Sequence, residues 1–280
     1  MSETTYDSVK AGMGSFSVSK GTISSSSGLD PTEEYKMNNK RRGLALIFNQ
    51  THFFTGFKTR FGTEVDRDNL EKRLKELGFE VRVYEDSTKE EVEERIKRAA
   101  EADHSDADCF LLAFFSHGDK DKVHAMDDEI NIQDITAPFK GDKCKSLVGK
   151  PKIFIFQACR GATHDTPATA AAAESEPKED ELMVDKGAIY TLPAGADFIM
   201  CYAVAEGYFS YRNRMEGSWF IQDLCKLLGE LGNSIEFTDL LTVVNREVSK
   251  RTVQFSDADA KQVPCFASML TKQLFFRPKQ

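Results

Sequence analysis

The sequence predicts an α/β fold in which helices cover both faces of a central, mostly parallel sheet of six strands. Two observations predict it: short apolar runs alternate with helical patterns along the chain, and two of the runs, 109–115 and 153–156, are almost continuously apolar. Such strands are typical of parallel sheets covered on both faces, and strand–helix alternation favours parallel connections. In such sheets, reactive residues gather where the strands end, at the carboxyl edge.

The individual elements follow from local patterns. The expected strands are, in chain order, 43–48, 79–84, 109–115, 153–156, 198–204 and 265–270. The expected helices are 66–77, 87–100, 217–231 and 237–251. Leucines three and four positions apart share one face of the first helix, and Gly78 is its natural stop. Ser87, with Glu90 three residues later, predicts a capping box that opens the second helix.

Composition limits the classes of protein that fit. The chain has 280 residues, of which 40% are hydrophobic and 29% charged. That is enough for one large core or two small ones, and a single α/β domain of roughly 240 residues is within the usual range. The formal net charge of −8 argues against the basic face of a duplex-binding protein, so we expect no nucleic-acid partner.

The cysteines indicate a reducing compartment. Six of them are scattered along the chain, without a C-x-x-C pair, and four lie in apolar runs. This pattern is typical of buried thiols rather than of a disulfide scaffold or a zinc site, so no metal and no cofactor is expected. There is no secretory pattern at the N-terminus, and no run approaches the roughly 18 apolar residues of a membrane span. We expect a cytoplasmic protein, with the nucleus as a second location and no membrane partner.

Two segments are expected to lack a core of their own. Residues 1–30 are rich in Ser, Gly and Thr and predict a disordered leader. Residues 162–186 combine an alanine cluster with an acidic run and predict an exposed linker. The alanines could instead form a short helix, which Pro167 and Pro177 weaken.

Two strand ends carry the candidate catalytic residues. His117 follows the strand 109–115, and Cys159 follows the strand 153–156. If these strands are parallel neighbours, the two side chains emerge side by side at one edge of the sheet. Peptide hydrolysis needs a thiolate nucleophile, a base and amide donors for the oxyanion. Gly118 and Cys159 could supply the donors through their backbone N–H groups.

Structural roles are the alternative for each residue alone. A cysteine after an apolar strand is usually a buried thiol, and a His-Gly pair is usually a turn. The pentapeptide 157–161, however, is a nucleophile signature of one group of cysteine peptidases, in which a histidine lies about 50 residues upstream. In this chain the separation from His117 to Cys159 is 42 residues. The pair therefore favours catalysis.

From about residue 30 to its end, the chain resembles the caspase family, in particular its executioner branch. The segments that carry the resemblance, besides 157–161, are 41–49, 62–66, 191–197, 217–222 and 263–266. The resemblance implies a three-layer α/β sandwich made of a large-subunit part, 31–161, and a small-subunit part, 187–280. It also implies a peptidase that cuts proteins after aspartate, acts in apoptosis and forms a homodimer through its last strand. Inhibitor proteins are further expected partners.

The resemblance also assigns the substrate pocket. Arg60 and Arg212 would hold the aspartate of the substrate, with Gln157 as a further amide donor, and the backbone carbonyl of Lys58 would orient His117. An arginine fork suits this task because it binds a carboxylate bidentately and stays charged. The neighbouring substrate pockets would be lined by Phe209, Tyr211, Asn213 and Trp219. A surface ion pair remains the alternative for each arginine, and core packing the alternative for Trp219.

Some features leave alternatives open. Residues 210–213 resemble one group of executioner caspases, whereas the short loop 255–262 is unlike theirs, so the fourth substrate position could take aspartate or an aliphatic side chain. Activation of a zymogen by cleavage of the linker would use Asp185 before Lys186, and Asp7 could release the leader. A catalytically weak adaptor with the same fold is the rival function, and intact candidate residues argue against it. A redox or metal-binding α/β protein would need paired cysteines or clustered histidines.

Overall fold

The computed structural model describes residue 30 and residues 32–160, 195–206, 208–255 and 258–279. The predicted linker and nearly all of the predicted leader, with Asp185 and Asp7, lie outside these residues, so the boundaries drawn for them stay predictions. Apart from residue 30, the described residues belong to one compact unit, Thr32–Gln280.

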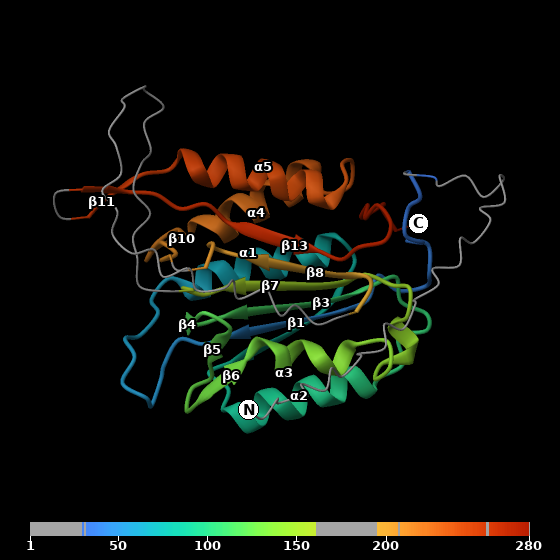
Figure 1. Ribbon diagram of the computed structural model, residues 1–280, viewed down its shortest axis with the longest axis horizontal. Helices are drawn as coiled ribbons and strands as arrows, with labels where there is room; N and C mark the ends of the chain where they lie inside the picture. The colour runs from blue at the N-terminus through green and yellow to red at the C-terminus, as the bar shows by residue number, and fades with distance from the viewer. Residues whose placement is uncertain (1–29, 31, 161–194, 207, 256–257, 280) are drawn as a thin grey trace, which may run out of the picture. The chain divides into compact units, whose positions relative to one another are not determined.

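A six-stranded sheet forms the middle layer of this unit (Figure 1). Its spatial order is β13-β8-β7-β3-β1-β2, and all neighbours are parallel except β13, which runs antiparallel to β8. The strands are β1 Leu44–Asn49, β2 Glu80–Glu85, β3 Phe110–Phe115, β7 Lys152–Gln157, β8 Phe198–Tyr202 and β13 Cys265–Ser268. The predicted mostly parallel sheet of six strands is confirmed.

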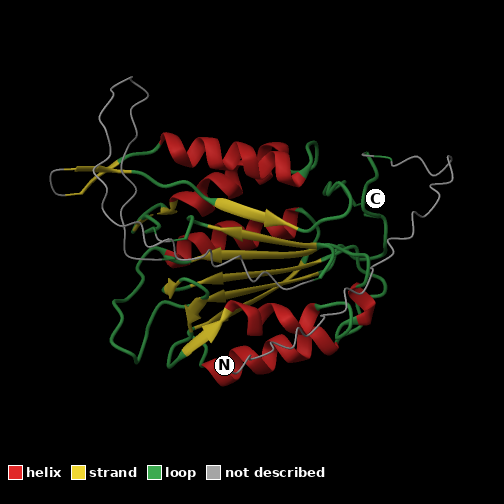
Figure 2. Cartoon of the chain, in the orientation of Figure 1, coloured by secondary structure: helices red, strands yellow, loops and turns green. Residues whose placement is uncertain are grey.

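Helices cover both faces of the sheet (Figure 2). One face carries α1 Thr63–Glu76, α4 Trp219–Leu231 and α5 Phe237–Lys250. The other carries α2 Lys89–Glu101, α3 Ile132–Thr136 and the 3₁₀ turns η1 Ala137–Phe139 and η2 Lys145–Leu147. Two separate apolar clusters result, because alternate side chains of each strand point to opposite faces. β1, β3 and β7 are buried at every position, as strands covered on both faces must be.

Small sheets beyond the central one were not predicted. They comprise a three-stranded sheet of β4 Gly118–Asp119, β5 Lys122–His124 and β6 Glu129–Asn131, a hairpin of β9 Arg212–Asn213 and β10 Gly217–Ser218, and a hairpin of β11 Val253–Phe255 and β12 Ala258–Ala260. Strands of two or three residues carry too little apolar periodicity to be recognised in a sequence.

The predicted capping box of α2 was wrong by one residue. Thr88, not Ser87, is the N-cap, and it exchanges hydrogen bonds with Glu91. Ser87 is committed elsewhere, because its carbonyl accepts hydrogen bonds from the backbone N–H of Met126 and from Gln50. Likewise α4 begins at Trp219 and not at 217, since the two residues before it pair with β9.

Candidate active site

The register of β3 and β7 brings His117 and Cys159 to the same level. Phe115 pairs with Gln157, and each candidate lies two residues beyond its member of this pair. A Cβ atom on Gly118 would lie 3.0 Å from the carbonyl oxygen of Cys159 and 2.7 Å from that of Lys122. Only glycine allows this close approach of the two chain segments.

His117 is oriented by a backbone carbonyl, as predicted. Its Nε2 lies 2.8 Å from the carbonyl oxygen of Lys58. Because a carbonyl can only accept a hydrogen bond, Nε2 carries the hydrogen and Nδ1 keeps a free lone pair. Burial lowers the pKa of His117 to about 4, against the raising effect of the Lys58 contact, and the charges of Arg60 and Arg212 lower it further. The imidazole is therefore a neutral base at pH 7.

Cys159 is half-buried at the end of β7, and its Sγ lies 3.6 Å from the hydroxyl oxygen of Ser210. The remaining thiols are free as well, and four of them are buried, whereas Cys265 is half-buried like Cys159. Cys109 is fully buried, which raises its pKa to about 12, and burial raises the pKa of Cys201 and Cys225 too. Cys144 is also buried. A thiol reacts as its thiolate, so these buried cysteines are poor nucleophiles.

Two arginines act electrostatically on His117, since the charge of each lowers its pKa. Arg60 is fully buried, and its Nη1 donates to the carbonyl of Gln50 at 3.0 Å and to the hydroxyl of Thr63 at 2.8 Å. Arg212 on β9 donates through Nε to the carbonyl of Phe61 at 2.9 Å. Burial, with the charge of Arg212, lowers the pKa of Arg60 to about 9. Two cations held this close form a site for an anion.

Gln157 ends β7, and half of its side-chain amide is unused. Its side chain is buried, Nε2 donates to Ser210 Oγ at 3.2 Å, and Oε1 has no hydrogen-bond partner among the described residues. Rotating the amide by 180° would let Oε1 accept the Ser210 hydroxyl and free the NH₂ group. After this rotation, the side chain of Gln157 would supply the predicted amide donor.

Two of the predicted pocket-lining residues meet at the start of α4. The rings of Tyr211 and Trp219 lie 5.1 Å apart. Trp219 is partly buried and packs against the core, which is the alternative role considered for it, and its role in a substrate pocket stays a prediction. Asn213 is exposed, and its Oδ1 accepts a hydrogen bond from the backbone N–H of Met215 at 2.7 Å. Phe209 is partly exposed on the same segment.

Sequence analysis missed Asp66, a buried carboxylate on α1. It accepts hydrogen bonds from the backbone N–H of Ser218 at 2.7 Å and from the Ser218 hydroxyl. Its pKa is raised to about 6 by burial, although both arginines and Ser218 act to lower it. A signal existed: Asp66 occupies the apolar stripe of α1, four residues before Leu70.

A family model for the caspase domain matches residues 42–275. The chain belongs to the caspase family. It is 56% identical to caspase-6 of Bos taurus over 260 residues, which cover 89% of each chain. It is 42% identical to caspase-7 of Gallus gallus over 252 residues, covering 88% of this chain and 81% of that one. The solved structure of caspase-1 from Spodoptera frugiperda is 40% identical and superposes with a TM-score of 0.79, covering 90% of this chain and 96% of the other.

This caspase is accordingly a cysteine-type endopeptidase, a hydrolase of peptide bonds in proteins, and its relatives place it among the apoptotic caspases. The expected resemblance and the caspase-like α/β fold are both confirmed. Within the described part of the chain, no helix is long and apolar enough to cross a membrane, and no group of three His, Cys, Asp or Glu residues could hold a metal ion.

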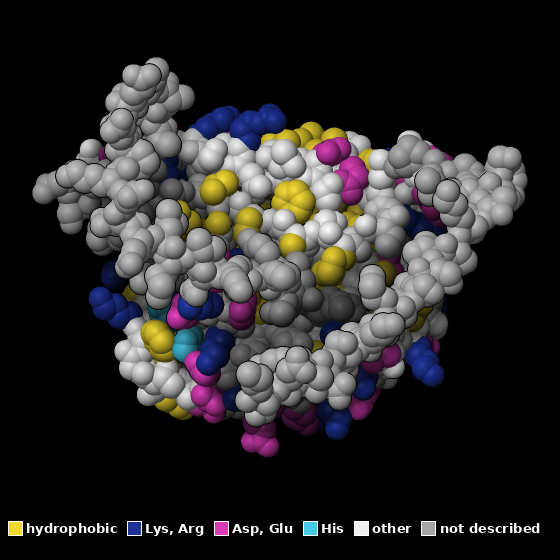
Figure 3. All heavy atoms as spheres, in the orientation of Figure 1, with side chains coloured by type: hydrophobic (Ala, Val, Ile, Leu, Met, Phe, Trp, Pro, Cys, Tyr) yellow, Lys and Arg dark blue, Asp and Glu magenta, His cyan; other side chains and the backbone are white. Residues whose placement is uncertain are grey.

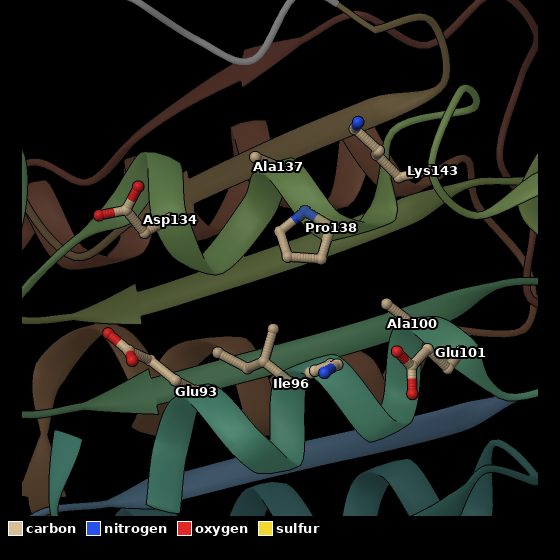
Figure 4. Close-up of a pocket in the computed structure, with 9 residues that line it drawn as sticks. Glu93, Ile96, Ala100, Glu101, Asp134, Ala137, Pro138 and Lys143 are labelled. Atoms are coloured by element: carbon tan, nitrogen blue, oxygen red, sulfur yellow. The ribbon is translucent and has the colours of Figure 1, made fainter. Parts of the chain in front are cut away.

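A separate groove of about 510 Å³ lies between α2 and the α3–η1 segment (Figure 4). Apolar side chains such as Ile96 and Pro138 line its inner surface, and charged groups such as Glu93, Asp134 and Lys143 surround them. The lining contains no cysteine or histidine, so it offers no nucleophile and does not compete with the pair at the sheet edge.

Proposed function

We propose that this caspase cleaves polypeptides after aspartate, with Cys159 as nucleophile and His117 as base. The observation that carries the proposal is the position of Arg60 and Arg212. Each is close enough to Cys159 for the two charges to interact, so a substrate carboxylate between the arginines would present its own carbonyl to the thiol. Gln157 adds a neutral donor at the same place.

The chemistry follows from the geometry. Nδ1 of His117 takes the thiol proton, and Sγ of Cys159 attacks the carbonyl carbon that follows the aspartate Cα. The N–H groups of Gly118 and Cys159 would bind the resulting oxyanion. Collapse breaks the C–N bond, and the imidazolium returns its proton to the leaving amine. Water, deprotonated by the same imidazole, then hydrolyses the thioester and restores the thiol.

Arginine variants test the pocket. Arg212→Leu should lower kcat/KM for an aspartate peptide by at least 10²-fold, because removing one partner of a desolvated charge pair costs several kcal/mol. Arg214→Leu is the matched control, since it lies on the same hairpin, is exposed and stacks on Phe61 instead. Equal losses of kcat/KM in the two variants would refute the proposal that Arg212 binds the substrate aspartate.

The resemblance also supports a zymogen. Cleavage after Asp185, between the large- and small-subunit parts, would let the segments that carry Cys159 and Arg212 settle into the binding geometry, and cleavage after Asp7 would release the leader. Exposed polar segments are where proteolytic nicking concentrates. We place the enzyme in the cytoplasm, with the nucleus as a second location, and expect inhibitor proteins among its partners.

A homodimer through β13 completes the proposal. This strand forms the edge of the sheet, where it pairs only with β8, and its side chains are at most partly buried. Hydrophobic side chains are exposed on the face that β13 borders (Figure 3), and Val263, just before the strand, is 38% exposed. An apolar edge strand invites pairing with another copy.

A further inference from the structure

The loop between β1 and α1, residues 50–62, contacts the imidazole of His117 at three points. The ring centroids of Phe53 and Phe57 lie 4.9 Å and 5.0 Å from that of His117. The Phe57 ring is stacked, with an interplanar angle of 22°, whereas Phe53 is tilted by 56°. The third contact is the carbonyl of Lys58, which accepts the Nε2 hydrogen. We call Phe53 and Phe57 the aromatic clamp.

We propose that Phe57 is a positioning residue for the catalytic base: its ring fixes the plane of the His117 imidazole and shields that face from water. The inference rests on the proposed function only in taking His117 as the base. An imidazole turns easily about its terminal torsion. A stacked ring on one face limits this rotation, and the Lys58 contact then selects one direction for Nδ1.

The position of Phe57 is unusual for a ring that serves a core. It is 42% exposed, so burial of apolar surface does not explain where it sits. Its neighbours are instead the two histidines and its clamp partner: the ring centroid lies 4.3 Å from that of His124 and 6.0 Å from that of Phe53. Gly56, with φ of 84°, makes the turn that returns the chain to His117.

Asp86 anchors the start of the loop at the end of β2. One carboxylate oxygen accepts the backbone N–H groups of Thr51 at 2.6 Å and His52 at 3.0 Å, and the other lies 2.6 Å from Nδ1 of His52. Asp86 itself holds the left-handed φ of 40°, a conformation that costs free energy in a non-glycine residue. Phe54 adds an N–H bond of 2.7 Å to the carbonyl of Met126. These bonds tie the loop on the Phe53 side of the clamp, and on the Phe57 side the backbone N–H of Arg60 donates to the carbonyl of Thr51 at 2.9 Å.

The surroundings of His117 determine in which direction its pKa should change when the Phe57 ring is removed. Arg60 before α1, Arg212 on β9 and His124 on β5 all disfavour a proton on the imidazole, and burial, the largest cause, acts the same way. The Lys58 carbonyl alone opposes them. Removing the Phe57 ring admits water to one face and weakens the effect of burial. The pKa of His117 should then rise from about 4 toward its ordinary value.

The test is an NMR titration of the histidine Cε1–H signals in the uncleaving Cys159→Ala protein, with His117 assigned by its loss in His117→Gln. Phe57→Ala should raise the pKa of His117 by about one unit or more. In the enzyme with Cys159 intact, a one-unit rise from about 4 should lower kcat/KM for the aspartate peptide about twofold at pH 5, and a larger rise should lower it further, with much less change at pH 8, because protonation inactivates the base only in acid.

Two variants separate positioning from general structure. Phe54→Ala removes a ring from the same loop that is 77% exposed and has no ring contact with His117, so its titration and rate should match the parent. Phe57→Leu keeps apolar cover and should restore the acid profile in part. An unchanged His117 titration in Phe57→Ala would overturn the inference, as would an equal shift in Phe54→Ala. Neither result depends on aspartate specificity. That specificity is tested separately, by comparing Asp and Asn peptides as substrates of the wild-type enzyme.

Discussion

Asp66 and Ser218, which lie 152 residues apart in the chain, are joined by two hydrogen bonds in a buried seam between α1 and the hairpin that carries Arg212. Ser218 pairs with Arg212 across the β9–β10 hairpin. A Cβ atom on Gly217 would lie 2.3 Å from a carboxylate oxygen of Asp66. No side chain larger than that of glycine therefore fits between the hairpin and Asp66 at this point. Helix α1 therefore holds the hairpin that carries Arg212 in place.

The first prediction concerns this seam. Ser218→Ala leaves the buried Asp66 carboxylate with one donor fewer, and hydrogen bonds to charged groups contribute about 1.5–3 kcal/mol. The free energy of unfolding in urea should fall by that amount, and KM for an aspartate peptide should rise as the hairpin loosens. Ser234→Ala removes an exposed hydroxyl that bonds the Leu231 carbonyl and is the matched control. Equal effects of the two substitutions would show that the seam is unimportant.

A second prediction follows from the raised pKa of Asp66, about 6. The unfolded chain has the ordinary value near 4, so between about pH 4 and 6 the folded state binds more protons and stability falls as pH rises. Asp66→Asn has no such proton to lose. The stability difference between Asp66→Asn and wild type should therefore shift in favour of the asparagine variant from pH 4 to 6.5. Urea midpoints measured across that range check it, and a flat difference would contradict it.

The third prediction concerns a buried ion pair far from the active site. Arg42 and Asp108 approach to 3.1 Å with both side chains fully buried. Asp108→Ala leaves an unpaired buried guanidinium and should cost about 3–5 kcal/mol. Asp106→Ala breaks a surface pair with Arg41 and should cost less than about 1 kcal/mol. Similar losses of unfolding free energy in the two variants would show that burial does not decide how much these ion pairs contribute to stability.

A fourth prediction concerns activation. Wild-type protein should release a fragment of 95 residues that begins at Lys186. The Cys159→Ala protein should remain a single chain by intact mass, because it lacks the nucleophile. Asp185→Ala should block this fragment while leaving His117 and Cys159 in place. Full activity in an uncut wild-type protein would show that the linker is no switch.

The middle of the central sheet could be predicted from the sequence because β1, β3 and β7 are apolar at most positions, which leaves few alternatives. His117 and Cys159 were expected at one sheet edge because each follows an apolar strand, whereas their common level depends on the pairing of Phe115 with Gln157. By contrast, the capping residue of α2 was ambiguous, since Ser87 and Thr88 each precede a glutamate by three positions. Only the contacts of Ser87 with the neighbouring strand loops decide between them.

The features that could not be predicted from the sequence depend on contacts between residues far apart in the chain or on the path of a loop. Asp66 and Ser218 meet only in the folded chain, and the aromatic clamp depends on the path of a loop without periodicity. The selection of Arg60 and Arg212 from 37 lysines and arginines came from the family resemblance, because neither composition nor spacing distinguishes them.

The most direct test of aspartate-specific catalysis is kcat/KM for two fluorogenic tetrapeptides that differ only by Asp or Asn at the cleavage position. Wild-type enzyme should prefer the Asp peptide by at least 10²-fold, because an amide carries no charge to pair with the buried Arg60 and the partly buried Arg212. Cys159→Ala should cleave neither peptide, and Cys265→Ala, which removes a different half-buried thiol, should keep the preference. Equal cleavage of the Asp and Asn peptides by wild type, or persistent activity in Cys159→Ala, would contradict the account.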